Sequence, residues 1–137
     1  GNAVEACRYL EAVPELQLNL DVSHWMCVHE TDLSDQETRL EAAIGRTFFL
    51  HARVGFDQGP QVPDPLCEVW KPWTDRHLEI WRRVLEVRKA SGHDILPITP
   101  EFGPPPYMPV NPHTGQPVAD AWETNVRFLS FLREALT

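Results

Sequence analysis

Residues 17–25 read Gln-Leu-Asn-Leu-Asp-Val-Ser-His-Trp, a short apolar strand that ends on side chains able to bind a metal. Two later segments repeat this design. The strand predicted at 47–51 ends on His51, and the strand predicted at 94–99 runs through a proline into Glu101. Three strands therefore end on an aspartate, a histidine and a glutamate, and this repetition is the main functional signal in the sequence.

Helical hydrophobic periodicity fills the segments around these strands, at residues 4–13, 34–44, 74–90 and 120–136. Ser34 with Glu37 and Asp120 with Glu123 are spaced as capping boxes, and Thr74 is the expected cap of the longest helix. The segment from Asp21 to Leu33 is predicted to be a loop. Strands that alternate with helices imply right-handed crossovers and a parallel sheet. We therefore predict an α/β fold in which three parallel strands alternate with four helices.

The second and third strands are followed by long, proline-rich connections, whereas the segments that enter the strands are short. In parallel α/β folds, binding sites lie at the C-terminal ends of the strands, where such loops gather. Asp21, His51 and Glu101 all lie at that end. Carboxylate oxygens with an imidazole nitrogen suit Mn²⁺, Mg²⁺, Co²⁺ or Zn²⁺, so the three residues predict one divalent metal site. Taken singly, each carboxylate also fits a helix cap or an ion pair, and His51 fits a buried imidazole.

Arg53 is a candidate for contacting a substrate. It follows His51 by two residues, so in an extended segment both side chains point to the same side of the chain. A guanidinium there can bind a substrate oxygen or a phosphate. The alternative is a structural ion pair with Asp57 or Asp64, and the sequence leaves both possibilities open.

The other histidines and aromatic residues are assigned by their place in the predicted elements. His24 follows Asp21 by three residues, and it can support the metal-binding residues, bind a substrate hydroxyl or be a loop histidine held in one tautomer. Trp25 and Tyr107 lie in predicted loops and can cover the apolar face of a sugar ring. Trp81 and Trp122 are expected to face the core. His77 is expected to be solvated and receives no role.

Composition excludes several classes of protein. A chain of 137 residues with 42% hydrophobic and 23% charged residues is typical of one globular unit. The net charge of −8 argues against nucleic acid as a partner, because phosphate binding depends on cationic side chains. No apolar run reaches the roughly 20 residues that cross a bilayer. The three cysteines are far apart in the sequence, which favours reduced thiols. We expect a soluble cytoplasmic protein.

Three short motifs carry a resemblance to a known family. They are Asp-Val-Ser-His at 21–24, His-Ala-Arg-Val-Gly at 51–55 and Pro-Glu-Phe-Gly at 100–103. In this order the motifs resemble the C-terminal part of the xylose-isomerase-like barrels, which are the sugar phosphate isomerase/epimerase superfamily and include zinc-dependent apurinic endonucleases. The resemblance extends over essentially the whole chain, residues 1–137. It implies a partial (β/α)8 TIM barrel and a chain that is a fragment of a longer one.

The resemblance also implies a reaction and roles for individual residues. The metal of this family is held by a glutamate, an aspartate, a histidine and a second glutamate, and Asp21, His51 and Glu101 match the last three. Glu101 resembles one of two glutamates that exchange a proton beside a sugar carbonyl through an enediolate. His24 and Arg53 resemble residues that contact substrate oxygens. The first glutamate would precede residue 1, so the isolated chain is expected to be nearly inactive.

A half-barrel is expected to expose its sheet edges and an apolar inner face. Self-association, or pairing with the missing half of the barrel, would cover these surfaces. The expected function is that of a metal-dependent sugar or sugar phosphate isomerase or epimerase. Two alternatives remain open at this point: a non-catalytic half-barrel that serves as an interaction module, and a protein similar to the zinc-dependent apurinic endonucleases.

Overall fold

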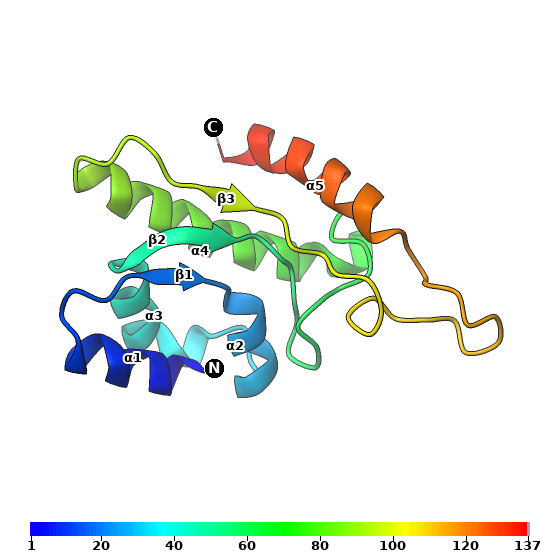
Figure 1. Ribbon diagram of the computed structural model, residues 1–137, viewed down its shortest axis with the longest axis horizontal. Coiled ribbons are helices and arrows are strands. Elements are labelled where there is room, and N and C mark those ends of the chain that lie inside the picture. The colour runs from blue at the N-terminus through cyan, green and yellow to red at the C-terminus, as the bar shows by residue number, and fades with distance from the viewer. Residues whose placement is uncertain (137) are drawn as a thin grey trace.

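The computed structural model describes residues 1–136 and forms an α/β fold around one three-stranded parallel sheet (Figure 1). Its strands lie in the order β1 (Leu18–Leu20), β2 (Thr47–His51) and β3 (Ile98–Thr99). The α-helices of this part of the chain are α1 (Ala3–Ala12), α2 (Val22–His29), α3 (Glu37–Ile44), α4 (Lys71–Ala90) and α5 (Ala121–Ala135), and the 3-10 helices are η1 (Ser34–Gln36) and η2 (Glu68–Trp70). The prediction of an α/β fold with three parallel strands is confirmed. The prediction of four helices is wrong, because the described residues form five α-helices.

Helix α2 is the element that the sequence analysis missed, since residues 22–29 were expected to be part of a loop. Asp21 is its N-cap, and the carboxylate accepts a hydrogen bond from the backbone N–H of Ser23 at 3.0 Å. Val22, Trp25 and Met26 lie three and four residues apart, and all are buried. The helix is too short for its hydrophobic periodicity to stand out in the sequence.

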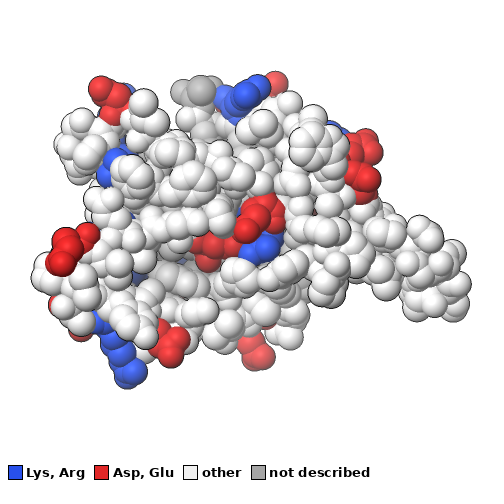
Figure 2. Space-filling view, in the orientation of Figure 1, with Lys and Arg blue, Asp and Glu red and all other residues white. Residues whose placement is uncertain are grey.

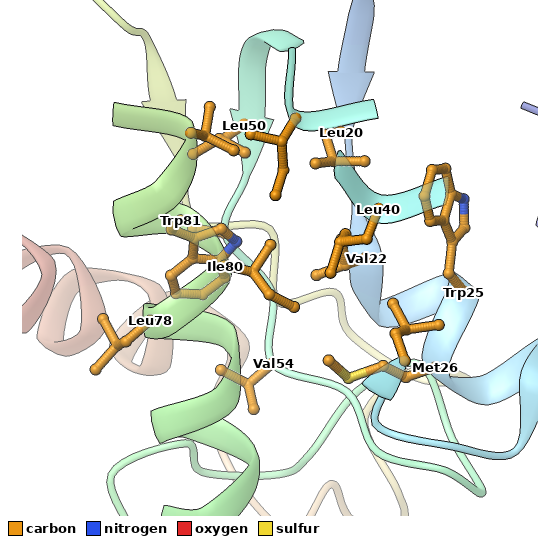
Figure 3. Packing of buried hydrophobic residues seen from close by; sticks show 14 of the residues in the cluster. Leu20, Val22, Trp25, Met26, Leu40, Leu50, Val54, Leu78, Ile80 and Trp81 are labelled. Atoms are coloured by element: carbon orange, nitrogen blue, oxygen red, sulfur yellow. The ribbon is translucent and has the colours of Figure 1, made fainter. Parts of the chain in front are cut away.

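The hydrophobic core lies between the sheet and the helices on one of its faces. Leu20 and Leu50 are paired in register across β1 and β2, and both are buried. Figure 3 shows them together with Ile80 and Trp81 of α4. Leu50 is also paired with Ile98 of β3, so the three strands contribute adjacent side chains to this core. The core therefore fixes the register of the sheet and, with it, the positions of the strand ends.

Strand β3 is shorter than the predicted strand at 94–99. It begins at Ile98, and the carbonyl of Pro97 accepts a hydrogen bond from Leu50 N–H at 3.0 Å. Proline has no N–H to donate in return, and Ile95 is exposed, so the ladder does not extend toward Asp94. The short strand is nevertheless enough to direct Glu101 toward the ends of β1 and β2.

The predicted helix caps are confirmed at one end of the chain and wrong elsewhere. Asp120 caps α5, where its carboxylate accepts from Glu123 N–H at 2.8 Å. Ser34 begins η1 rather than α3. Thr74 lies inside α4, and its hydroxyl donates to the carbonyl of Pro65 at 2.7 Å. Serine and threonine form several local hydrogen bonds of similar strength, so their presence near a helix does not fix its first residue.

Helix α5 has apolar residues on two sides, and only one side is buried. Phe128 packs edge-on against the rings of Trp81 and Phe102, at centroid distances of 6.2 and 5.4 Å. Trp122 precedes Phe128 by six residues, which places it about 120° away around the helix. It is 77% exposed, so the expectation that Trp122 faces the core is wrong.

The second face of the sheet carries a mixed set of side chains. Asn19 and Thr99 are exposed there, and Phe49 and His51 are half-buried. The ring of Phe49 meets that of His51 at a centroid distance of 5.5 Å, which places both on one side of β2. The expectation of an apolar inner face is therefore wrong. Among residues 1–136, no helix has both the length and the apolar character that crossing a bilayer requires.

Candidate metal centre

Asp21, His51 and Glu101 converge at the C-terminal ends of the three strands. Asp21 directly follows β1, His51 is the last residue of β2, and Glu101 lies two residues beyond β3. One potential ligand atom of each residue lies within 4.8 Å of those of the other two. His51 Nδ1 and Glu101 Oε2 are 2.8 Å apart. Figure 2 shows acidic and basic side chains side by side near the middle of the surface in view.

These three residues fit a divalent cation in chemistry and nearly in spacing. Two ligands at about 2.1 Å from one ion are at most about 4.2 Å apart, so side-chain shifts of less than about 1 Å bring all three donors to a common ion. Two carboxylates and one imidazole suit Mn²⁺, Mg²⁺, Co²⁺ or Zn²⁺. Within residues 1–136, this is the only group of three or more metal-ligand side chains with such spacing.

Asp21 accepts three hydrogen bonds in this structure, from two residues. Its Oδ1 accepts from the Ser23 N–H at 3.0 Å and from the Ser23 hydroxyl at 2.5 Å, and its Oδ2 accepts from Arg53 at 2.6 Å. The helix cap and the ion pair, which were alternatives to metal binding in the sequence, are thus both present. One oxygen of the same carboxylate still lies within 4.8 Å of potential ligand atoms of His51 and Glu101.

Arg53 is the cation of this cluster and is only 3% exposed. Besides Asp21, its guanidinium lies 3.6 Å from Glu101 Oε2, and its Nε donates to the Ser23 hydroxyl at 3.2 Å. The alternative partner Asp64 is instead 3.2 Å from Arg127. The structure therefore places Arg53 in the candidate site, where a single positive charge lies between two carboxylates.

His24 and Tyr107 complete the surroundings of Arg53. Arg53 donates to His24 Nε2 at 2.5 Å, which makes Nε2 the acceptor and leaves the ring proton on Nδ1. The guanidinium carbon of Arg53 lies 4.9 Å from the centroid of the Tyr107 ring, a cation–π distance. Trp25 belongs to the hydrophobic core and is 7% exposed, so it has little surface for a ligand. It is adjacent to His24 on α2 and therefore points about 100° away from it.

Two residues of the site were not identified from the sequence. Ser23 bridges Asp21 and Arg53, and the Asp-x-Ser spacing of an Asx turn is the signal that would have revealed it. Asn19 contacts His51 from the neighbouring strand, where Nδ2 and Nε2 are 3.0 Å apart. Its signal is the two-residue spacing to Asp21, which places both side chains on one side of the extended chain.

Gly55 and His77 support the chain behind the site. A Cβ atom on Gly55 would lie 2.8 Å from the Cβ of Ser23, so only glycine lets the segment after β2 approach α2 this closely. The backbone N–H of Gly55 donates to His77 Nε2 at 3.3 Å, and His77 Nδ1 lies 2.8 Å from the Trp73 carbonyl. The expectation that His77 is solvated is wrong, since its side chain is fully buried.

The buried His77 makes the stability of the fold sensitive to acid. Burial lowers the pKa of His77 from 6.5 to about 4. The unfolded chain therefore binds a proton more readily, and stability is lost as the pH falls from about 6.5 through about 4. We expect wild type to lose about 3 kcal/mol more than His77→Gln over this range. Urea unfolding at several pH values measures the difference, with His113→Gln as the exposed-histidine control. Parallel curves for wild type and His77→Gln would contradict the assignment.

Comparisons of this chain with models of known protein families, with curated proteins and with solved structures found no match.

Proposed function

We propose that this chain is the C-terminal half of a xylose-isomerase-like (β/α)8 barrel and that it acts in the isomerisation or epimerisation of a sugar or sugar phosphate. The convergence of Asp21, His51 and Glu101 at the ends of three adjacent parallel strands carries the proposal. A bound divalent metal would supply a Lewis acid that polarises a sugar carbonyl and so acidifies the neighbouring C–H group.

Glu101 is the candidate group that moves the proton. Its side chain is 42% exposed, and its Oε2 is the atom nearest to both His51 and Arg53. A carboxylate at this position reaches a ligand on the open face of the sheet while one oxygen remains held by the cluster. The Arg53 guanidinium stabilises negative charge that develops on a substrate oxygen beside it. In this assignment Glu101 exchanges the proton and Arg53 offsets the charge.

His24 and Tyr107 are the candidate substrate contacts. Since His24 Nε2 accepts from Arg53, its Nδ1–H remains to donate to a sugar hydroxyl. Tyr107 is partly exposed beside both residues, with its ring 6.4 Å from that of His24, and its free ring surface suits the C–H face of a sugar. Trp25 is left out of the proposed contacts because it is buried in the core.

A sugar reaction is a better fit to this site than cleavage of nucleic acid. The net charge is −8, and the one cation at the centre of the site already lies between two carboxylates. Binding a phosphodiester backbone depends on several free cationic side chains. A neutral polyhydroxylated ligand needs hydrogen-bonding groups and one Lewis acid, and this cluster can provide both.

Ketose binding next to a metal tests this proposal. We expect Mn²⁺-loaded protein to broaden selectively the NMR signals of D-fructose around C2, which is the carbonyl carbon of the open-chain form. His24→Ala is expected to weaken this sugar binding about tenfold by removing one hydrogen bond. Sorbitol, which carries a hydroxyl at C2 in place of the carbonyl, is the ligand control. Equal broadening of the fructose and sorbitol signals contradicts the proposed function. It is also contradicted if an Asp21→Asn variant that has lost Mn²⁺ broadens the fructose signals as much as wild type does.

A further inference from the structure

The backbone that follows Glu101 is bonded by two side-chain carboxamides. Strand β3 ends two residues before Glu101, so this part of the chain lies outside the sheet. Gln61 pairs with Gly103: its Oε1 accepts from the backbone N–H at 2.8 Å, and its Nε2 donates to the carbonyl at 3.0 Å. Asn125 pairs with Phe102 in the same way, at 2.9 and 2.8 Å. Both polar groups of each backbone unit are therefore paired.

A carboxamide that bonds both groups of one residue takes the place of a residue in a neighbouring strand. In an antiparallel ladder, two facing residues exchange one N–H···O bond in each direction. A side-chain amide reproduces this pair because it carries an acceptor oxygen and N–H donors. The backbone N–H only donates and the carbonyl only accepts, so the partners decide the orientation of each amide. Side chains thus continue the hydrogen bonding of the sheet beyond the end of β3.

The two carboxamides come from different elements, and each is anchored there. Gln61 is 4% exposed, and the next residue, Val62, donates its N–H to the Val54 carbonyl at 2.9 Å, which ties this segment to the chain after β2. Asn125 lies in α5 and also donates to the Ala121 carbonyl at 2.8 Å. The pairs with Gln61 and Asn125 therefore fasten residues 102 and 103 to two packed parts of the fold.

The carboxylate of Glu101 depends on its backbone for its position, because burial does little to fix it. The side chain is 42% exposed, yet its Oε2 lies 2.8 Å from His51 Nδ1. The chain after Gly103 continues with three prolines at 104–106, and proline has no backbone N–H that could tie the segment down. Residues 102 and 103 are thus the place where the chain can be held close to Glu101.

We propose that Gln61 and Asn125 are positioning residues that hold Glu101 at the candidate metal centre by clamping the backbone of the two residues after it. This inference rests on the proposed function, in which Glu101 binds the metal and exchanges a proton with the substrate. Both amides act through the backbone, so they set the place and the order of Glu101 and leave its charge unchanged. Outer groups that orient metal ligands typically change metal affinity by about 10- to 100-fold.

Two substitutions each remove one half of this clamp. Gln61→Met keeps the length of the side chain and Asn125→Leu keeps its volume, but neither new side chain can bond the backbone. Thr124→Val is the matched control for Asn125→Leu, because Thr124 and Asn125 each donate to the carbonyl four residues earlier in the chain. Gln17→Met is the control for Gln61→Met, since Gln17 is exposed. Circular dichroism verifies that each variant folds.

The experiment reads the order of Glu101 and the affinity for metal separately. In metal-free protein, ¹³C relaxation of the Glu101 methylene groups reports whether the side chain is held, and hydrogen exchange reports the amides of Phe102 and Gly103. We expect an ordered Glu101 in wild type and in both controls. In Gln61→Met and Asn125→Leu we expect a mobile Glu101 and about tenfold faster exchange of the released amide. Zn²⁺ calorimetry should show about tenfold weaker binding by these two variants and affinities within about threefold of wild type for the controls.

The outcomes distinguish this inference from the proposed function. If the order of Glu101 does not differ between wild type and the two clamp variants, the inference is overturned, whatever the metal does. It is also overturned if Glu101 becomes mobile while the affinity stays equal to that of a wild type that binds Zn²⁺. If Thr124→Val loosens Glu101 as much as Asn125→Leu does, a general weakening of α5 explains the effect and the inference fails. A mobile Glu101 in both clamp variants, with no Zn²⁺ bound by any of the proteins, supports the clamp and overturns the metal site.

Discussion

Replacing His51 with alanine is expected to weaken Mn²⁺ and Zn²⁺ binding by more than about 100-fold, since even the outer partners of metal ligands contribute 10- to 100-fold. His51 is the only nitrogen donor of the trio, and its Nδ1 lies 2.8 Å from Glu101 Oε2, so its loss leaves a metal ion with only the two carboxylates. Glu101→Gln and Asp21→Asn are expected to weaken binding to a similar degree. Asparagine at position 21 keeps a side-chain oxygen for Ser23 N–H, so the cap of α2 survives in that variant.

Calorimetric titration of each variant with Mn²⁺ and Zn²⁺ measures this effect. His113→Ala is the matched control, because it removes an exposed histidine of the loop between β3 and α5 without touching the cluster. Circular dichroism of each variant verifies that the fold is retained. Affinities of all three ligand variants within a factor of about three of wild type, a difference of less than about 1 kcal/mol, would contradict the assignment of the centre.

The sequence predicted the strands and the three converging residues because both depend on periodicity and order alone. Asp21, His51 and Glu101 each follow an apolar strand, and the C-terminal ends of parallel strands meet at one edge of the sheet. The burial of Leu20 and Leu50 fixes the register that makes the three ends coincide. No detail of side-chain packing was needed for this part of the prediction.

The missed features depend on tertiary contacts that leave little trace in the sequence. Helix α2 has only eight residues, and its stability comes from burying Val22, Trp25 and Met26 rather than from a long periodic pattern. His77 is buried because Gly55 and Trp73 provide partners for both ring nitrogens. Gly55 lies 22 residues from His77 in the sequence, and Trp73 lies 4 residues from it. The sequence shows a histidine on a helix, but not what packs over it.

Asp21 shows why functional and structural interpretations of one residue need not exclude each other. The sequence left a helix cap, an ion pair and a metal ligand as alternatives, and in the structure the same carboxylate caps α2, pairs with Arg53 and faces His51 and Glu101. A carboxylate has two oxygens and about four acceptor positions, so it can serve several partners at once. The cap and the ion pair therefore do not exclude the proposal that Asp21 is also a metal ligand.

Removing Arg53 is expected to produce the largest loss of stability at the site, and a divalent metal is expected to offset much of it. In Arg53→Met the aliphatic volume is kept, but the largely buried carboxylate of Asp21 loses its cation and faces Glu101 with no charge between them. Breaking a buried ion pair by removing one partner costs about 3–5 kcal/mol. Arg127→Met is the matched control, because Arg127 and Asp64 form an exposed pair whose loss should cost less than about 1 kcal/mol.

Urea unfolding with and without Mn²⁺ decides whether the carboxylates, once freed from Arg53, bind a cation. A metal at 100 times its dissociation constant stabilises the folded state by about 2.7 kcal/mol. At a fixed Mn²⁺ concentration this gain should be larger for Arg53→Met than for wild type, because the metal no longer shares the two carboxylates with a guanidinium. If Mn²⁺ stabilises both proteins equally, Arg53 does not compete for these oxygens. If Arg53→Met loses no more stability than Arg127→Met, the buried ion pair contributes little to folding. The cluster then does not depend on Arg53 to hold Asp21 and Glu101 together.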